Sequence, residues 1–172
     1  MQPGDIGLCH SLGFLPRLIR VMQRLRYHNG RPCARWSHAF MLVEPVSELD
    51  GDGWRDWVII EAESKGVQFS WLSQMGEYVI LDSGQDQRGR ELALRFADRA
   101  LGSKYGFFTL LSIAVNLILP TSWQVTRAGT FICSGLVAHA LEHGGYIFPL
   151  KWEADEVMPA DLACLFRPVA NG

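Results

Sequence analysis

Residues 131–143 read FICSGLVAHALEH, and this stretch is the most informative part of the chain about its fold. Leucine, valine and alanine recur through it at helical spacing, and Gly144 and Gly145 end the pattern. We therefore expect a helix over 131–143 with Cys133 in its first turn. The dipole and unpaired N–H groups of a helix N-terminus favour an anion, so a thiol there ionises easily. An inert cysteine packed as a small hydrophobe is the alternative.

A nucleophilic cysteine needs an imidazole within hydrogen-bond reach, and the chain has five histidines. Four of them fall in or beside predicted loops, or on later turns of the same helix. These are His10, His28, His139 and His143. His38 remains, because it opens the apolar run 39–43, which predicts a central strand. A core histidine with its hydrogen bonds satisfied is the alternative interpretation.

A third group should orient the imidazole, and two glutamates are candidates. Glu61 follows the apolar run 58–60 on a predicted neighbouring strand, where a carboxylate is costly unless it has a partner. Glu63 lies two residues further on and would point to the same face. Both glutamates could instead mark the solvent end of a strand.

The rest of the chain predicts one α+β domain over 1–172, with an antiparallel sheet of five to six strands flanked by helices. Strand-like runs dominate the first half, and helical periodicity dominates the second. The expected strands are 4–8, 37–44, 57–62, 66–69 and 78–81. Helices are expected over 16–27 and 89–102, a loop over 28–35, and a turn at 158–163 that feeds a last strand. The apolar stretch 107–119 is too short to span a bilayer, so a buried helix is favoured over an interfacial membrane segment.

Composition and charge limit the classes of partner, metal and cellular location that we expect. The 172 residues carry a formal net charge of −2, which does not suggest a nucleic-acid partner. The four cysteines show no zinc-site spacing, so we expect no metal and no cofactor. No export signal opens the chain, which favours reduced cysteines and a cytoplasmic or phage-associated protein.

Positive charge is nevertheless concentrated in one segment, because no acidic residue lies between Asp5 and Glu44. Its arginines are Arg17, Arg20, Arg24, Arg26, Arg31 and Arg35. They form either a solvated helix face or a rim that attracts a peptide carboxylate or a lipid phosphate. As candidate substrate-binding residues we take three of these arginines and three neighbours of the reactive groups. The six are Arg17, Arg20, Arg24, Trp36, Ser37 and Ser134.

Several short motifs resemble the NlpC-type cell-wall peptidases, a papain-like family. The stretches GSKYG at 102–106, FICSGLV at 131–137 and GGYIFP at 144–149 resemble that family's tyrosine motif, its cysteine helix and the glycine and proline that follow. The stretch SHAFMLV at 37–43 resembles its histidine strand, but here this strand precedes the cysteine. That order is similar to the circularly permuted branch, which includes YiiX-like bacterial hydrolases and, more distantly, lecithin retinol acyltransferase.

The resemblance implies a permuted papain-like fold and a cysteine peptidase or amidase. Cys133 would be the nucleophile, His38 the base and Glu61 its orienting group, with the Tyr105 hydroxyl and the Cys133 N–H stabilising the oxyanion. A Tyr105 ring that only packs between helix and sheet is the alternative. The implied substrate is an amide bond in peptidoglycan or γ-linked peptides. Two alternatives are a lipid thioesterase or acyltransferase, with 107–119 at the membrane surface, and a non-catalytic module of a bacterial or phage assembly.

Overall fold

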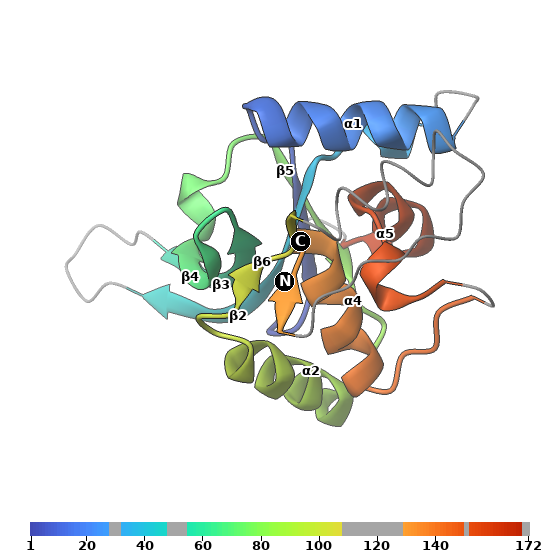
Figure 1. Ribbon diagram of the computed structural model, residues 1–172. Coiled ribbons are helices and arrows are strands. Elements are labelled where there is room, and N and C mark those ends of the chain that lie inside the picture. The colour runs from blue at the N-terminus through green and yellow to red at the C-terminus, as the bar shows by residue number, and fades with distance from the viewer. Residues whose placement is uncertain (28–31, 48–54, 108–128, 150–151, 170–172) are drawn as a thin grey trace.

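The computed structural model describes residues 1–27, 32–47, 55–107, 129–149 and 152–169 (Figure 1). Six strands form one antiparallel sheet in the order β4-β3-β2-β1-β5-β8, which agrees with the expected α+β class. The strands are β1 Ile6–Cys9, β2 His38–Ser47, β3 Arg55–Glu63, β4 Gly66–Trp71, β5 Tyr78–Asp82 and β8 Arg167–Pro168. The first strand of the chain therefore lies inside the sheet, between β2 and β5.

The strand β1 is buried on both faces, because alternate residues enter two different hydrophobic clusters. Ile6 and Leu8 belong to the larger cluster, together with Met41 of β2. Cys9 belongs to the smaller cluster, together with Phe40. Side chains along a strand alternate between its faces, so this division follows directly from the sequence of each strand.

The helices cover the sheet, and α4 is the most deeply buried of them. The bounds are α1 Phe14–Arg26, α2 Gln87–Arg99, α4 Cys133–His143 and α5 Pro159–Leu165. Short 3-10 helices occur at η1 Pro32–Arg35, η2 Leu72–Gln74 and η3 Ala154–Glu156. The apolar residues of α4 are fully buried because the helix packs against α2, β2 and β3. A helix that is apolar on nearly all sides requires this kind of environment.

The structure corrects three sequence-based predictions. The turn expected at 158–163 is wrong, because α5 occupies this segment and only the two-residue strand β8 follows it. Pro159 suggested a turn, but proline is also favoured at the first position of a helix. The helix α5 has only seven residues, so its helical spacing was hard to detect. The loop expected over 28–35 contains η1, and the helix expected from Phe131 begins at Cys133. Phe131 instead lies in β7 Thr130–Phe131, which pairs in parallel with β6 Lys104–Tyr105.

Two further predictions concern membranes. The stretch 107–119 lies outside the described residues, apart from Phe107. Within the described ranges, no helix has the length and apolar character needed to cross a bilayer.

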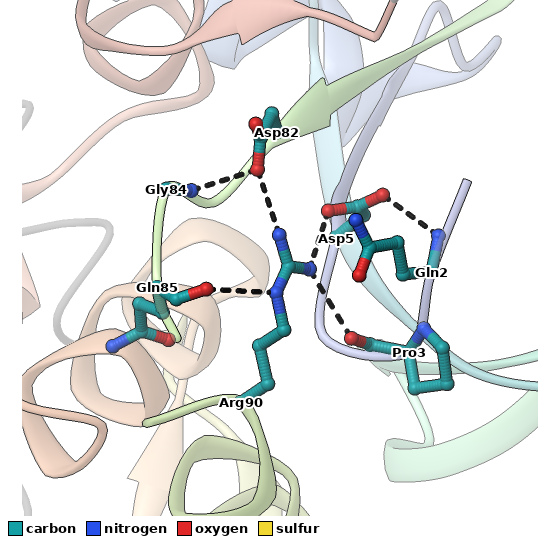
Figure 2. Close-up of polar contacts among 7 residues, drawn as sticks. All are labelled: Gln2, Pro3, Asp5, Asp82, Gly84, Gln85 and Arg90. Atoms are coloured by element: carbon teal, nitrogen blue, oxygen red, sulfur yellow. Dashed lines mark hydrogen bonds and ion pairs between the residues drawn. The ribbon is translucent and has the colours of Figure 1, made fainter. Parts of the chain in front are cut away.

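A buried arginine fixes the start of β1 to the start of α2 (Figure 2). Arg90 Nη1 donates to Asp5 Oδ1 at 2.6 Å and to the Pro3 carbonyl at 3.2 Å. Its Nη2 donates to Asp82 Oδ1 at 2.7 Å, and its Nε donates to the Gln85 carbonyl at 3.0 Å. Asp5 directly precedes β1, so this cluster anchors the end of the strand opposite Cys9.

Candidate active site

Four elements bring together the side chains that the sequence singled out. His38 is the first residue of β2, Glu61 lies in β3, and Cys133 is the first residue of α4. Tyr105 ends β6 and pairs with Phe131, two residues before Cys133. The short parallel pair of β6 and β7 therefore holds Tyr105 beside the start of α4.

Three buried side chains, Cys133, His38 and Glu61, lie together at the centre of the site. His38 Nε2 lies 2.6 Å from Glu61 Oε2, and the other oxygen of Glu61 accepts a hydrogen bond from Ser70 Oγ. The Cys133 thiol and the His38 ring line the same pocket, and each shifts the pKa of the other. Since Glu61 engages Nε2, Nδ1 is the ring nitrogen left for sulfur. Glu63, the other candidate for the third position, is exposed, and Glu61 is the glutamate that bonds His38.

This arrangement favours a thiolate paired with an imidazolium. Burial raises the pKa of the Cys133 thiol, but the hydrogen bond and charge of His38 outweigh burial and lower the pKa below its usual value. Backbone hydrogen bonds from Ala39 and Ser134 lower it further. Burial likewise opposes the charged form of His38, yet hydrogen bonds to Cys133 and Glu61 hold the pKa of His38 well above its usual value.

The pKa values of Glu61 and Tyr105 are also shifted from their usual values. Burial raises the pKa of Glu61, but the hydrogen bond and charge of His38 bring it below its usual value, so Glu61 is a carboxylate. Burial and the nearby charges of Cys133 and Glu63 raise the pKa of Tyr105 far above its usual value. Tyr105 therefore keeps its phenolic proton, and it lines the same pocket as Cys133.

The thiol and imidazole border a pocket of about 200 Å³ at one end of the sheet. The lining residues come from α1 and the segment that leads into it, from the start of β2 and from the end of β3, together with Tyr105 and Cys133. They are Ser11, Leu12, Pro16, Ile19, Ser37, His38, Ala62, Glu63, Ser64, Tyr105 and Cys133. A larger hollow of about 590 Å³ lies over the Arg90 cluster, but its lining contains neither a thiol nor an imidazole.

Of the six candidate substrate-binding residues, only Ser37 lines this pocket. Arg20 braces it from outside, since its Nη1 donates to the Ser11 carbonyl at 3.0 Å and to Ser37 Oγ at 3.1 Å. Trp36 is buried in the larger core beneath the guanidinium of Arg35, which lies 4.3 Å from the ring centroid.

The remaining three candidates also lie away from the pocket. Ser134 is buried, and its hydroxyl donates to the Val157 carbonyl at 2.6 Å, so it fixes α4 to the segment before α5. Arg17 and Arg24 lie on the exposed face of α1 and are absent from the pocket lining.

Sequence reasoning missed two residues beside the site. Ser70 bonds Glu61, and Cys9 stands directly opposite His38 in the β1–β2 pair. Burial raises the pKa of the Cys9 thiol, so this second sulfur is less easily ionised than Cys133. The sequence did contain a signal for Ser70. Gln68 stands opposite Glu61 on the next strand, and Ser70 lies two residues further on, so its side chain points to the same face.

His139 and His143 are held elsewhere, as their positions on α4 predict. His139 Nε2 lies 2.9 Å from Asp155 Oδ1, and His143 stacks on Phe96 with ring centroids 4.1 Å apart. Both rings are engaged by other partners, and among the described histidines His38 is the one that lines the pocket with Cys133.

The same pocket also offers a set of possible metal ligands. One ligand atom each from His38, Glu61 and Glu63 lies within 4.8 Å of the others. A cation bound there would have to replace the 2.6 Å hydrogen bond between His38 and Glu61. A metal centre and a thiol–imidazole pair oriented by Glu61 are therefore competing uses of these side chains.

Comparison with known proteins gives no relative: neither a family model nor a curated protein matches the chain. The chemistry of the site therefore rests on its own geometry. A thiol at a helix N-terminus, an imidazole in contact with it and a carboxylate behind the imidazole are what nucleophilic catalysis by cysteine requires.

Proposed function

We propose that this chain is a cysteine hydrolase with a circularly permuted papain-like fold, Cys133 as nucleophile and His38 as base. The observation that carries the proposal is that Cys133 and His38 line one pocket, with Glu61 hydrogen bonded to Nε2 of the His38 ring. The unusual order, with histidine and glutamate before cysteine, is no obstacle, because such sites depend on geometry and not on sequence order.

In the acylation step, the Cys133 thiolate, whose proton is already on His38, forms a bond from sulfur to the carbonyl carbon of the substrate. Collapse of the tetrahedral intermediate breaks the bond to the leaving group, which takes the proton from His38. Glu61 holds the imidazole in place and stabilises its charged form. The product of this half-reaction is a thioester on Cys133.

In the deacylation step, His38 takes a proton from water as the water oxygen attacks the thioester. The carboxylic acid leaves, and the proton remains on His38 beside the regenerated Cys133 thiolate. The Cys133 N–H and the Tyr105 hydroxyl would stabilise the oxyanion in both steps, and Tyr105 retains the proton this requires.

The bond we propose is an amide, in peptidoglycan or γ-linked peptides. An amine leaving group must be protonated as it departs, and the raised pKa of His38 supports an imidazolium that can supply this proton. The open lining of the pocket, with Ser11, Ser37, Ser64 and Glu63, suits a polar peptide more than a bare acyl chain.

The test is intact-mass analysis after incubation with a peptidoglycan digest in the presence of EDTA. Wild type should gain an acyl adduct or release product, and Cys133→Ala should do neither. Cys164→Ser is the matched control, because Cys164 is an exposed cysteine outside the pocket lining, and it should behave as wild type.

Two outcomes would contradict the proposal. Turnover that Cys133→Ala retains would exclude the thiol as nucleophile. Turnover that EDTA abolishes and a divalent cation restores would instead favour a metal held by His38, Glu61 and Glu63.

A further inference from the structure

The exposed side of α1 combines aliphatic and cationic side chains. Val21 and Leu25, four residues apart, are 51% and 48% exposed, and Arg17 and Arg24 are exposed beside them. Residues spaced by three, four and seven positions share one side of a helix, so these four form a continuous strip. We call Arg17, Val21, Arg24 and Leu25 the α1 outer face.

The opposite side of α1 accounts for its attachment to the protein, so the outer face is not needed for packing. Ile19 and Met22 are buried in the larger core. Gln23 Nε2 donates to the Trp36 carbonyl at 2.7 Å, and its Oε1 accepts from the Ala160 N–H at 2.8 Å. In Figure 1, α1 lies along the upper edge of the molecule.

The charge on the α1 outer face is not neutralised locally. Among the described residues, no hydrogen bond or ion pair reaches the guanidinium of Arg17 or Arg24, and residues 6–43 contain no acid. This contrasts with α2, a helix of the same length. Its exposed residues include both signs of charge: Gln87, Arg88, Glu91, Leu92, Arg95, Asp98 and Arg99.

A third observation connects this face to the pocket. Leu12, 84% exposed, lies two residues before α1 and lines the pocket together with Pro16 and Ile19 of α1. The pocket wall and the outer face are therefore parts of the same helix and its leading segment, and Leu12 adds a third exposed aliphatic side chain there.

We propose that the α1 outer face, together with Leu12, docks on an anionic lipid bilayer. Guanidinium groups match lipid phosphates in a forked geometry, and exposed aliphatic side chains between them can enter the boundary between headgroups and acyl chains. The formal net charge of the whole chain is −2, so the attraction is local to this face. Docking would hold the pocket next to the membrane surface, and it does not require that Cys133 be catalytic.

The test is flotation of the full chain with two kinds of vesicle, phosphatidylglycerol mixed with phosphatidylcholine and phosphatidylcholine alone. The chain should float with the anionic vesicles only, and added salt should weaken binding because it screens surface charge. Arg17→Glu/Arg24→Glu should lower the partition coefficient by about thirtyfold or more. Val21→Ser/Leu25→Ser should lower it by roughly tenfold, because less apolar surface is buried.

The matched control is Arg88→Glu/Arg95→Glu, which makes the same charge change on α2 and should leave flotation as in wild type. Thermal unfolding of each variant checks that it remains folded. Wild type that fails to float with anionic vesicles would overturn the docking proposal. Flotation unaffected by the two α1 double variants, as a different lipid- or protein-binding face would give, would overturn it as well.

Cys133→Ala separates this inference from the proposed function. It should float as wild type does, because Cys133 is buried at the end of the sheet and is not part of the α1 outer face. Failure to detect hydrolysis therefore leaves the flotation result valid, and failure to float leaves the hydrolase proposal untouched.

Discussion

His38 and Glu61 bond diagonally across β2 and β3. Glu61 stands opposite Phe40 in the ladder, yet its carboxylate reaches back to His38 Nε2 at 2.6 Å. Side chains two positions apart on a strand share a face, and diagonal neighbours lie within reach of long side chains. A shift of one residue in this pairing would turn Glu61 to the other face of the sheet. The geometry of the site is therefore set by the register of two strands.

Replacing Glu61 tests whether its hydrogen bond to His38 supports catalysis. Glu61→Gln keeps the shape of the side chain but removes the charge that stabilises the imidazolium, so kcat/KM should fall by about 10²-fold or more. The pKa of His38 should also fall, and the imidazolium would then be lost at lower pH, which moves the alkaline limb of the rate profile downward. Glu63→Gln is the control and should leave that limb near its wild-type position.

The lowered pKa of Cys133 predicts unusual alkylation kinetics. Iodoacetamide should label Cys133 well below the pH range near 8.5 where ordinary thiols ionise, because the thiolate is already formed there. Peptide mapping by mass spectrometry gives the rate at each pH. In His38→Ala the profile should move to higher pH. If wild type were labelled only in the alkaline range where a free thiol ionises, this would argue against a thiolate–imidazolium pair of Cys133 and His38.

Tyr105 should contribute to the rate without contributing much to substrate binding. Tyr105→Phe removes one proposed oxyanion donor, so kcat should fall by about 10²- to 10³-fold, corresponding to about 2.7–4 kcal/mol, with little change in KM. Tyr78→Phe provides the comparison, because Tyr78 is exposed on β5. An unchanged kcat in Tyr105→Phe would mean that the ring only packs between the helix and the sheet.

Arg90 should matter for stability. Arg90→Met leaves the buried carboxylate of Asp5 without its counter-charge, and the free energy of unfolding should fall by about 3–5 kcal/mol. Urea unfolding measures the change, with the exposed Arg88→Met as control. Asp5→Asn in the Arg90→Met background should recover part of the loss, since it removes the unpaired charge.

Gly7 is required by the ring of Phe40, its partner across β1 and β2. A Cβ at Gly7 would lie 1.9 Å from the nearest atom of that ring, so Gly7→Ala must displace Phe40 and should cost about 1–3 kcal/mol. Gly76→Ala meets nothing within 4 Å and should leave the unfolding midpoint nearly unchanged. Equal midpoints for the two variants would contradict this packing.

Much of the sheet could be predicted because its pattern is local. The runs at 57–62, 66–69 and 78–81 lie within observed strands, and the run at 37–44 does so apart from Ser37, which precedes β2. The turn at 64–65 fixes the register of β3 with β4, and that register places Gln68 opposite Glu61. Extending β4 two residues further would have pointed to Ser70 as well.

The parts that could not be predicted depend on contacts between distant segments. The strands β6 and β7 have two residues each, and they form because they pair with each other. Ser134 carries no sequence signal that its hydroxyl bonds the Val157 carbonyl, and Trp36 carries none that Arg35 covers it. For the same reason, the exposed Arg17 and Arg24 could not be told apart from pocket residues by spacing alone.

The position of α4 late in the chain has a consequence for biosynthesis. His38 and Glu61 belong to neighbouring strands, whereas Cys133 follows Glu61 by 72 residues. On the ribosome, the imidazole and carboxylate can therefore meet long before sulfur emerges. The thiol gains its acidity only after Cys133 has been synthesised, so a polypeptide truncated before α4 lacks the ion pair altogether.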